Sequence, residues 1–297
     1  MAEHSLATLP HWLLAAFFAD GEAPPLADAA RITENDRELT AGETALSGAT
    51  RLGQYRIAAH DESSGQSALC GQMWFGDVAA VCGVRIRCDG GRISEVEIIR
   101  SPSRFPGSTG VEASELGAVR PPFGRIVPLE RRLSRERLVA IAGGYYEAVN
   151  LERPELARLE PNGARIEAGT QITGNPAFRF DFYQGLDGQA LPNFGEWTAR
   201  EQFERGLWNA DLVPEVRFPV VEPRYGLVFA FMTYCPWGKR AEVDVVGVGR
   251  VGPAGDPARR VALNAMEVFR IDHDRIEEME SVWSIEPGGY RNSWCRR

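Results

Sequence analysis

The chain has 297 residues, enough for two domains of ordinary size, and 44% of its residues are hydrophobic and 25% are charged. This composition can bury a core large enough to offset the conformational entropy of folding, which excludes extended disorder. The formal net charge is −8 and basic residues form no run, which argues against a nucleic-acid partner. No apolar run approaches the ~20 residues that cross a bilayer, and the apolar N-terminal stretch lacks the basic start of a secretion signal. We therefore expect a soluble, cytoplasmic protein without a membrane partner.

The five cysteines form no C-x-x-C pair and no short cluster with histidine, which argues against a structural metal site and a disulfide scaffold. Phosphate loops, dinucleotide fingerprints, nucleophile elbows and H-E-x-x-H motifs are also lacking in the sequence. These observations predict that the protein uses no metal and no cofactor.

The first third of the chain predicts one helix followed by strands. Residues 10–20 have the composition of a short helix that stops at Asp20-Gly21. Alternating segments separated by turn residues then predict strands within 30–40, 53–61, 66–76, 79–88 and 92–101. Residues 101–128 contain five prolines and little periodicity, which is typical of a connector. We predict a first domain over 1–103, a linker over 104–130 and a second domain over 131–297.

The second domain opens with a predicted helix. Ser134 is a good N-cap, and apolar residues recur at helical spacing from Leu138 to Val149. A strand and turn are expected over 164–176, an irregular aromatic and glycine-rich insertion over 177–195, and a helix over 198–208. Further strands are predicted over 215–223, 225–235, 241–251 and 262–285, with the last segment turning near Asp272–Asp274.

The two halves resemble each other. ARITENDRELT (30–40) matches ARIEAGTQIT (164–173), and VRIRCDGGRISEVEIIRS (84–101) matches FRIDHDRIEEMESVWS (269–284), each with a short gap. The matches occur in the same order and in the same structural roles, which indicates a duplicated unit. A helix followed by a run of strands predicts an α+β unit in which an antiparallel sheet curls over the helix.

This pattern resembles the NTF2-like superfamily, which includes SnoaL-type cyclases and ketosteroid isomerase. The segments ITENDRELTAGE, YRIAAHDESSGQ, RIEAGTQITGNP and EQFERGLW…RFPVVEPRYGLVFAF resemble an uncharacterised two-domain SnoaL-like family known mainly from fungal and bacterial genomes. The resemblance implies tandem NTF2-like (SnoaL-like) cones, each a curved antiparallel sheet wrapped on helices. The superfamily also contains bacterial enzymes that release formaldehyde from lignin-derived aromatic dimers without a cofactor, which implies a candidate activity.

The resemblance also implies catalytic residues in the second domain. In ketosteroid isomerase a helix tyrosine donates to the substrate oxygen and a carboxylate at the end of the next strand acts as base. This pattern places Tyr145, with its neighbour Tyr146, near the donor position and Glu167 within one residue of the base position. The chain departs from it by that offset and by lacking an acidic dipeptide. The alternative is that Tyr145 belongs to the core and Glu167 pairs with Arg165.

In the first domain Glu34 falls at the corresponding base position, and His60 ends a strand beside Asp61. Glu97 lies opposite in face to Val96 and Ile98, so its side chain is a candidate for the interior of the first cone. Solvent-facing carboxylates and a structural histidine are the alternatives for these three positions.

Aromatic residues gather late in the chain, which favours a flat, aromatic ligand. Alternation over 226–235 puts Phe231 on one face and Tyr234 on the other. Lys239 is the only lysine and follows Trp237-Gly238, so it could hold a phenolate or oxyanion; an exposed loop lysine is the alternative. The predicted substrate-binding residues are Trp197, Phe231, Tyr234, Trp237, Trp283 and Arg217.

We therefore expect a cofactor-independent lyase or isomerase acting on a small aromatic, possibly lignin-derived, compound. The lyase reaction would be dehydration or formaldehyde-releasing C–C cleavage. A non-catalytic NTF2-like module that binds a small molecule or assembles is the alternative. A third interpretation makes the first domain a degenerate partner of a catalytic second domain, and the sequence leaves homo-oligomerisation open.

Overall fold

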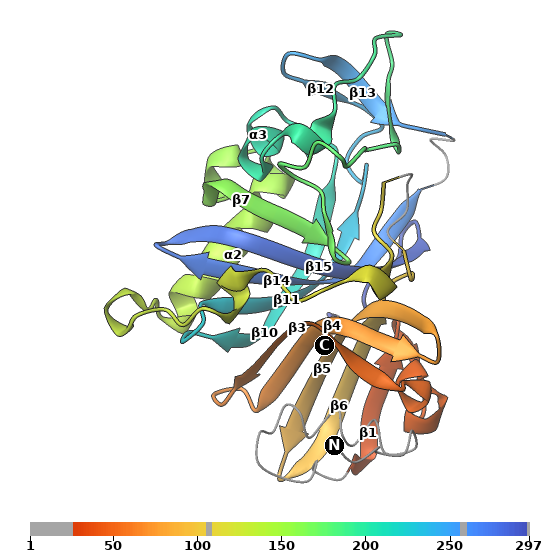
Figure 1. Ribbon diagram of the computed structural model, residues 1–297, viewed down its shortest axis with the longest axis vertical. Helices are drawn as coiled ribbons and strands as arrows, with labels where there is room; N and C mark the ends of the chain where they lie inside the picture. The colour runs from red at the N-terminus through yellow and green to blue at the C-terminus, as the bar shows by residue number, and fades with distance from the viewer. Residues whose placement is uncertain (1–25, 105–108, 256–259, 296–297) are drawn as a thin grey trace.

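The computed structural model describes residues 26–104, 109–255 and 260–295. The helix predicted over residues 10–20 lies outside these ranges. Two six-stranded sheets dominate the described part of the chain, with the first sheet below and the second sheet above in Figure 1.

The first sheet has the strand order β2-β1-β6-β5-β4-β3. Its strands are β1 (Leu26–Glu34), β2 (Arg37–Glu38), β3 (Arg51–Asp61), β4 (Gln66–Phe75), β5 (Val78–Asp89) and β6 (Arg92–Arg100). Short 3-10 turns occupy Ala41–Glu43 and Ala45–Gly48 between β2 and β3, and three more, Ala113–Glu115, Pro121–Gly124 and Leu129–Arg131, occupy the connector after β6.

The second sheet has the order β10-β11-β14-β15-β7-β8. Its strands are β7 (Leu159–Glu167), β8 (Thr170–Gln171), β10 (Leu212–Glu222), β11 (Leu227–Cys235), β14 (Val261–Asp272) and β15 (Arg275–Pro287). Helix α2 (Arg135–Leu151) packs on one face of this sheet and the shorter α3 (Ala199–Glu204) lies beside β7. Ser134 caps α2 by accepting a hydrogen bond from the Arg137 backbone N–H, as the sequence predicts.

The strand orders of the two sheets are the same when β1 to β6 are read against β7, β8, β10, β11, β14 and β15 in turn. In each sheet the first strand pairs parallel to the last strand, and every other pairing is antiparallel. The sheets are therefore mixed, which corrects the prediction of purely antiparallel sheets. The parallel pairing joins segments that lie more than 60 residues apart, such as Ile32 with Val96, and local alternation carries no signal for it.

A third, smaller sheet is an insertion into the second unit. It has the order β12-β13-β9, from β9 (Tyr183–Gly185), β12 (Val243–Val245) and β13 (Gly249–Pro253). The sequence predicted one strand over 241–251, but the chain turns back there at Gly247, where φ is +78°. This three-stranded sheet, with the segments that flank it, is called the cap below; it lies beyond α3 at the far end from the first sheet (Figure 1).

The two large sheets pack face to face through an apolar layer to which both contribute. At Gly83 the sheets approach so closely that an added Cβ atom would lie 2.8 Å from the Met266 side chain. The C-terminal segment also returns to the first sheet, where the Trp294 indole N–H donates to the Thr33 hydroxyl over 2.9 Å. The predicted domain boundaries at 103 and 131 fall between the last strand of the first sheet and α2.

Candidate functional site

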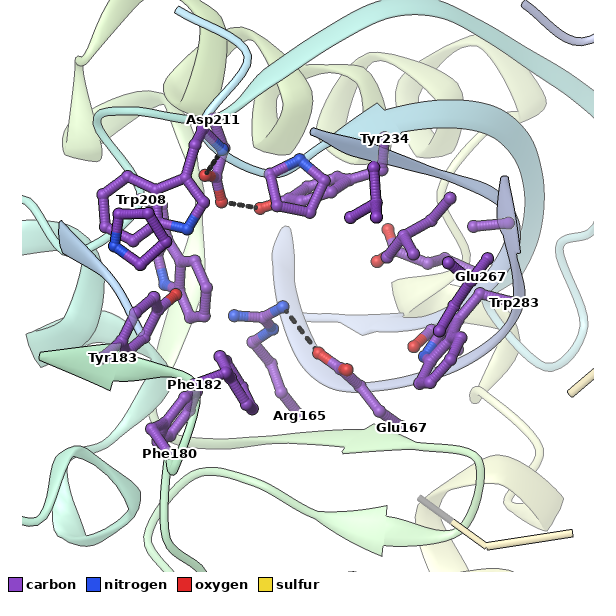
Figure 2. Close-up of a pocket in the computed structure, with 18 of the residues that line it drawn as sticks. Arg165, Glu167, Phe180, Phe182, Tyr183, Trp208, Asp211, Tyr234, Glu267 and Trp283 are labelled. Atoms are coloured by element: carbon purple, nitrogen blue, oxygen red, sulfur yellow. Dashed lines mark hydrogen bonds and ion pairs between the residues drawn. The ribbon is translucent and has the colours of Figure 1, made fainter. Parts of the chain in front are cut away.

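A cavity of about 350 Å³ lies between the second sheet and the cap. The sheet supplies one wall from β7, β11, β14 and β15, and the opposite wall comes from the cap and from the turn before β10. The lining residues are Arg165, Glu167, Phe180, Phe182, Tyr183, Trp208, Asp211, Tyr234, Pro236, Trp237, Pro253, Ala254, Val261, Leu263, Ala265, Glu267, Ser281, Trp283 and Ile285. Figure 2 shows Arg165 and Glu167 extending into this cavity from below, with Asp211 above them.

The sheet register brings the acidic side chains of the cavity wall together. Glu267 on β14 pairs with Ser281 on β15, which in turn pairs with Glu167 on β7, so the three form one row across the sheet. Glu267 and Glu167 are two strand spacings apart, or roughly 10 Å. The short Ser281 side chain between them leaves space for part of a ligand.

Glu267 is 6% exposed and accepts a hydrogen bond from the Tyr146 hydroxyl over 2.6 Å. Burial raises its pKa to about 7, and the negative charge of Glu167 adds to the rise, while the Tyr146 hydrogen bond and Arg165 oppose it. Near neutral pH this carboxyl group therefore exists in both protonation states.

Asp211 precedes β10 and faces the same cavity. Its carboxylate accepts hydrogen bonds from the Tyr234 hydroxyl over 2.5 Å and from the Trp237 backbone N–H over 2.9 Å. Burial raises the pKa of Asp211 to about 6 against the effect of these two hydrogen bonds. The Trp237 backbone has a positive φ of 57°, which is unfavourable for a bulky residue. The hydrogen bond to Asp211 holds that conformation at the cavity wall.

Among the residues that the structure describes, Arg165 is the only cationic side chain that lines this cavity, and it is 5% exposed. Its Nη2 donates to Glu167 over 3.1 Å, and its guanidinium carbon lies 4.3 Å from the centre of the Trp208 ring. Burial raises the pKa of Glu167, and the positive charge of Arg165 opposes the rise. The arrangement thus contains one carboxyl group beside a cation and two others bonded to phenols.

Aromatic rings form the apolar wall. Tyr183 stacks on Phe180 with ring centres 5.6 Å apart and meets Trp237 edge-on at 5.4 Å. Phe180 also contacts Trp208, at 6.1 Å between ring centres. A wall of this kind suits a flat, apolar ligand.

The structure brings four predicted residues, Glu167, Tyr234, Trp237 and Trp283, into the cavity. Tyr146 lies behind the wall and reaches the cavity through its bond to Glu267. Glu167 also forms an ion pair with Arg165, as the alternative interpretation predicts.

Tyr145 and Trp197 are packed elsewhere in the second unit. Tyr145 is 1% exposed, and its ring packs against Phe203 and Phe269 with centres 5.0 and 5.5 Å away. Trp197 packs on Phe194 with ring centres 4.9 Å apart. Neither side chain lines the cavity.

Lys239 lies at the C-terminal end of α2, outside the lining of the cavity. Its ammonium group donates to the Val149 carbonyl over 2.7 Å and lies 3.4 Å from a carboxylate oxygen of Glu152. A cation at this end of a helix interacts favourably with the helix dipole and the free carbonyls. The contacts of Lys239 are therefore those of a helix cap.

Phe231 and Arg217 face the first sheet rather than the cavity. Phe231 belongs to the apolar layer between the sheets, as the alternation that separates it from Tyr234 implies. Arg217 forms an ion pair with Glu97 over 2.7 Å. Glu97 is 1% exposed between the sheets, where Arg85 and Arg217 hold its pKa below the ordinary value although burial raises it.

The two candidates of the first unit have local partners. Glu34 accepts a hydrogen bond from the Ala45 backbone N–H over 2.5 Å and pairs with Arg100 over 3.1 Å. A ring nitrogen of His60 lies 2.9 Å from the Ser67 hydroxyl on the neighbouring strand. Neither residue lines the cavity of the second unit.

The sequence patterns did not point to Asp211 or Glu267 as cavity residues. Glu267 does carry a signal, because it shares one face of its strand with Leu263, Ala265 and Phe269 and so stands as an acid within an apolar row. Asp211 lies in a turn between a helix and a strand and has no comparable signal. Within the described ranges, no three acidic, histidine or cysteine side chains are placed to hold a metal ion, and no helix is long and apolar enough to cross a membrane.

The family model described as a domain of unknown function (DUF8021) matches residues 131–283, slightly more than half of the chain. The chain therefore belongs to this family. Arg165, Glu167, Asp211 and Glu267 all lie within the matched residues. No curated protein matches the chain.

Similar solved structures include TsrD from Streptomyces laurentii, with 17% identity over 51% of this chain and 91% of that chain and a TM-score of 0.30. An LEH-like epoxide hydrolase of M. tuberculosis has 12% identity over 50% of this chain and 84% of that chain, with a TM-score of 0.27. An uncharacterized protein with a cystatin-like fold from Caulobacter vibrioides has 12% identity over 50% and 88% of the two chains, with a TM-score of 0.27.

Proposed function

We propose that the protein is a cofactor-independent enzyme that transfers protons on a small aromatic compound, as a lyase or an isomerase. The observation that carries the proposal is the pair Asp211 and Glu267, two buried carboxyl groups with pKa values of about 6 and about 7 in an aromatic-walled cavity. General acid–base catalysis is most efficient when the pKa of the catalytic group lies near the working pH. Carboxyl groups tuned in this way gather at active sites.

The environments of Glu167 and Glu267 suit them to opposite roles. The Arg165 guanidinium favours the ionised form of Glu167, which makes this carboxylate the proposed base. Burial raises the pKa of Glu267 to about 7 against the opposing effect of the Tyr146 hydrogen bond, which makes this carboxyl group the proposed acid. A compound lying over Ser281 would have the base on one side and the acid on the other.

In a dehydration, Glu167 would take a proton from a substrate carbon while the electron pair of that C–H bond forms a C=C bond. The C–O bond at the neighbouring carbon would break, and Glu267 would give its proton to the departing oxygen, releasing water. In the formaldehyde-releasing variant, Glu167 would instead take the O–H proton of a hydroxymethyl group. The C–C bond to that group would break to release formaldehyde, and its electron pair would form the C=C bond. The C–O bond at the neighbouring carbon would break at the same time, and Glu267 would give its proton to the departing oxygen, releasing water.

The size and walls of the cavity support a small aromatic substrate. A cavity of about 350 Å³ holds a compound of one or two rings. The stacked rings of Phe180 and Tyr183 offer a flat apolar surface against which such a ring can pack.

The test is turnover by the purified full chain on hydroxylated aromatics and lignin-type dimers, followed by mass spectrometry for loss of water or formaldehyde and by NMR for isomers. The Glu267→Gln variant should lose at least ~100-fold in kcat/KM. Glu280→Gln is a matched control, because Glu280 is another buried carboxyl group on the same sheet and accepts a hydrogen bond from Tyr55 of the first unit. A ligand that is retained unchanged after long incubation, or a fully active Glu267→Gln protein, would instead support a non-catalytic binding or assembly module.

A further inference from the structure

We infer that Arg165 and Trp208 form a subsite for an uncharged oxygen acceptor of the ligand, such as the carbonyl oxygen of a small aromatic ketone or aldehyde. The inference rests on two N–H donors that the protein leaves free. Among the described residues, neither the Nη1 group of Arg165 nor the Nε1 group of Trp208 has a hydrogen-bond partner. Both side chains are nearly fully buried, at 5% and 6% exposure.

The two side chains that carry these donors lie next to each other in the cavity wall. Both residues line the cavity, and the guanidinium group of Arg165 stacks on the Trp208 ring at 4.3 Å. The other amino group of Arg165 is held by Glu167, which fixes the direction of the guanidinium plane. Figure 2 shows the guanidinium projecting into the cavity, toward its centre.

Leaving such donors without an acceptor is unfavourable. A buried N–H group without a partner loses the hydrogen bond that it makes with water in the unfolded chain, and the loss is greater when the donor is charged. Native proteins satisfy the large majority of their buried polar groups, so two neighbouring free donors in one cavity need an explanation. A ligand oxygen placed at this wall would supply the missing acceptor.

The charges around the cavity favour an uncharged acceptor over a carboxylate. Within the described ranges, the only cation among the lining residues is Arg165, and Glu167 already offsets its charge. A permanent anion would also face Asp211 and Glu267, and like charges in one cavity repel each other. A carbonyl oxygen avoids this repulsion and still offers an acceptor to the N–H donors of this wall.

This assignment deepens the proposed function, because it takes the same cavity as the substrate site and names the class of substrate. It also specifies where the oxygen of the ligand lies: on the Arg165 and Trp208 side, opposite the Glu267 end of the acidic row. The aromatic part of the ligand would then pack along Phe180 and Tyr183.

The experiment compares three naphthalene probes that differ in one group: 2-acetylnaphthalene, 2-ethylnaphthalene and 2-naphthoate. Binding is measured by titration with the purified full chain, and the carbonyl stretch of the bound ketone is measured by infrared difference spectroscopy. The ketone should bind at least ~10-fold more tightly than the ethyl compound, because only the ketone satisfies the free donors. Its carbonyl band should move to lower wavenumber on binding.

The Trp208→Phe variant keeps an aromatic ring and removes the N–H donor. It should reduce the preference for the ketone over the ethyl compound by ~3- to 10-fold. The carbonyl band of the bound ketone should also shift less than in the wild-type protein. The matched control is Trp237→Phe, which removes another indole from the same wall and should weaken both neutral probes together.

Equal affinity for the ketone and the ethyl compound, or an unshifted carbonyl band in the wild-type protein, would overturn the subsite. Tighter binding of 2-naphthoate than of the ketone would overturn the inference that the acceptor of the ligand is uncharged. The probes report on binding alone. A preference for the ketone would therefore support the subsite even if no substrate is turned over, and turnover would support the proposed function even if the protein does not prefer the ketone.

Discussion

Glu267 provides the most quantitative prediction, because its ionisation is coupled to folding. Its ordinary pKa is 4.5, and in the folded protein burial raises it to about 7. Between these two values the folded state holds the proton more tightly than the unfolded chain. The stabilising contribution is therefore complete below about pH 4.5 and is lost as the pH rises through about 7.

Each unit of difference between the folded and unfolded pKa values corresponds to about 1.4 kcal/mol. The complete loss of free energy of unfolding therefore amounts to about 3 kcal/mol. Glu267→Gln keeps the shape of the side chain and can accept from Tyr146, but it cannot ionise. The free energy of unfolding should be measured by urea denaturation from about pH 5 to about pH 8.5 for both proteins. Over that range the wild type should lose about 2 to 3 kcal/mol relative to the variant.

A difference between the two proteins that does not change with pH would refute this reasoning, since it would mean that Glu267 has the same pKa folded and unfolded. Glu280→Gln is the control for burial in general. Glu280 bonds to the Tyr55 hydroxyl and the Gly169 backbone N–H, and burial raises its pKa to about 8. The loss of stability that comes from ionisation of Glu280 should therefore extend to about one pH unit higher than the loss that comes from Glu267.

Three other variants separate the cavity from the rest of the fold. Tyr146→Phe removes the hydroxyl that donates to a buried carboxylate, so urea denaturation should show a loss of about 1–3 kcal/mol, and the pH profile of kcat/KM should move to higher pH. Arg217→Met removes one of the two arginines that pair with Glu97 between the sheets. It should lower the free energy of unfolding by about 3 kcal/mol and leave ligand affinity unchanged. Weaker ligand binding at an equal folded fraction would contradict the placement of Arg217 outside the cavity. Lys239→Met should cost about 1 kcal/mol by loss of the donor to the Val149 carbonyl, with kcat retained, and a large loss of kcat would show that the lysine acts on substrate.

Local patterns predicted the elements of the second unit well. The N-cap Ser134 and the helical spacing after it indicate α2, and alternation along β11 assigns Phe231 and Tyr234 to opposite faces. Both are properties of a few neighbouring residues, which sequence periodicity reports directly.

The cavity itself could not be predicted in this way, because its parts meet only through long-range pairing. Glu167 and Glu267 are 100 positions apart, and they share a row only because β7 pairs parallel to β15. Lys239 illustrates the same limit: its neighbours in sequence are aromatic, but its ammonium group reaches the end of α2, a helix about 90 residues earlier. Nearness in sequence to Trp237 therefore did not place it in the cavity.

The most direct measurement of the central claim is the titration of the cavity carboxyl groups by ¹³C NMR on the labelled full chain, with assignment from the Asp211→Asn and Glu267→Gln variants. The account predicts that Asp211 titrates at a pKa of about 6 and Glu267 at about 7. Titration of both groups below about pH 5, as for exposed carboxylates, would contradict it.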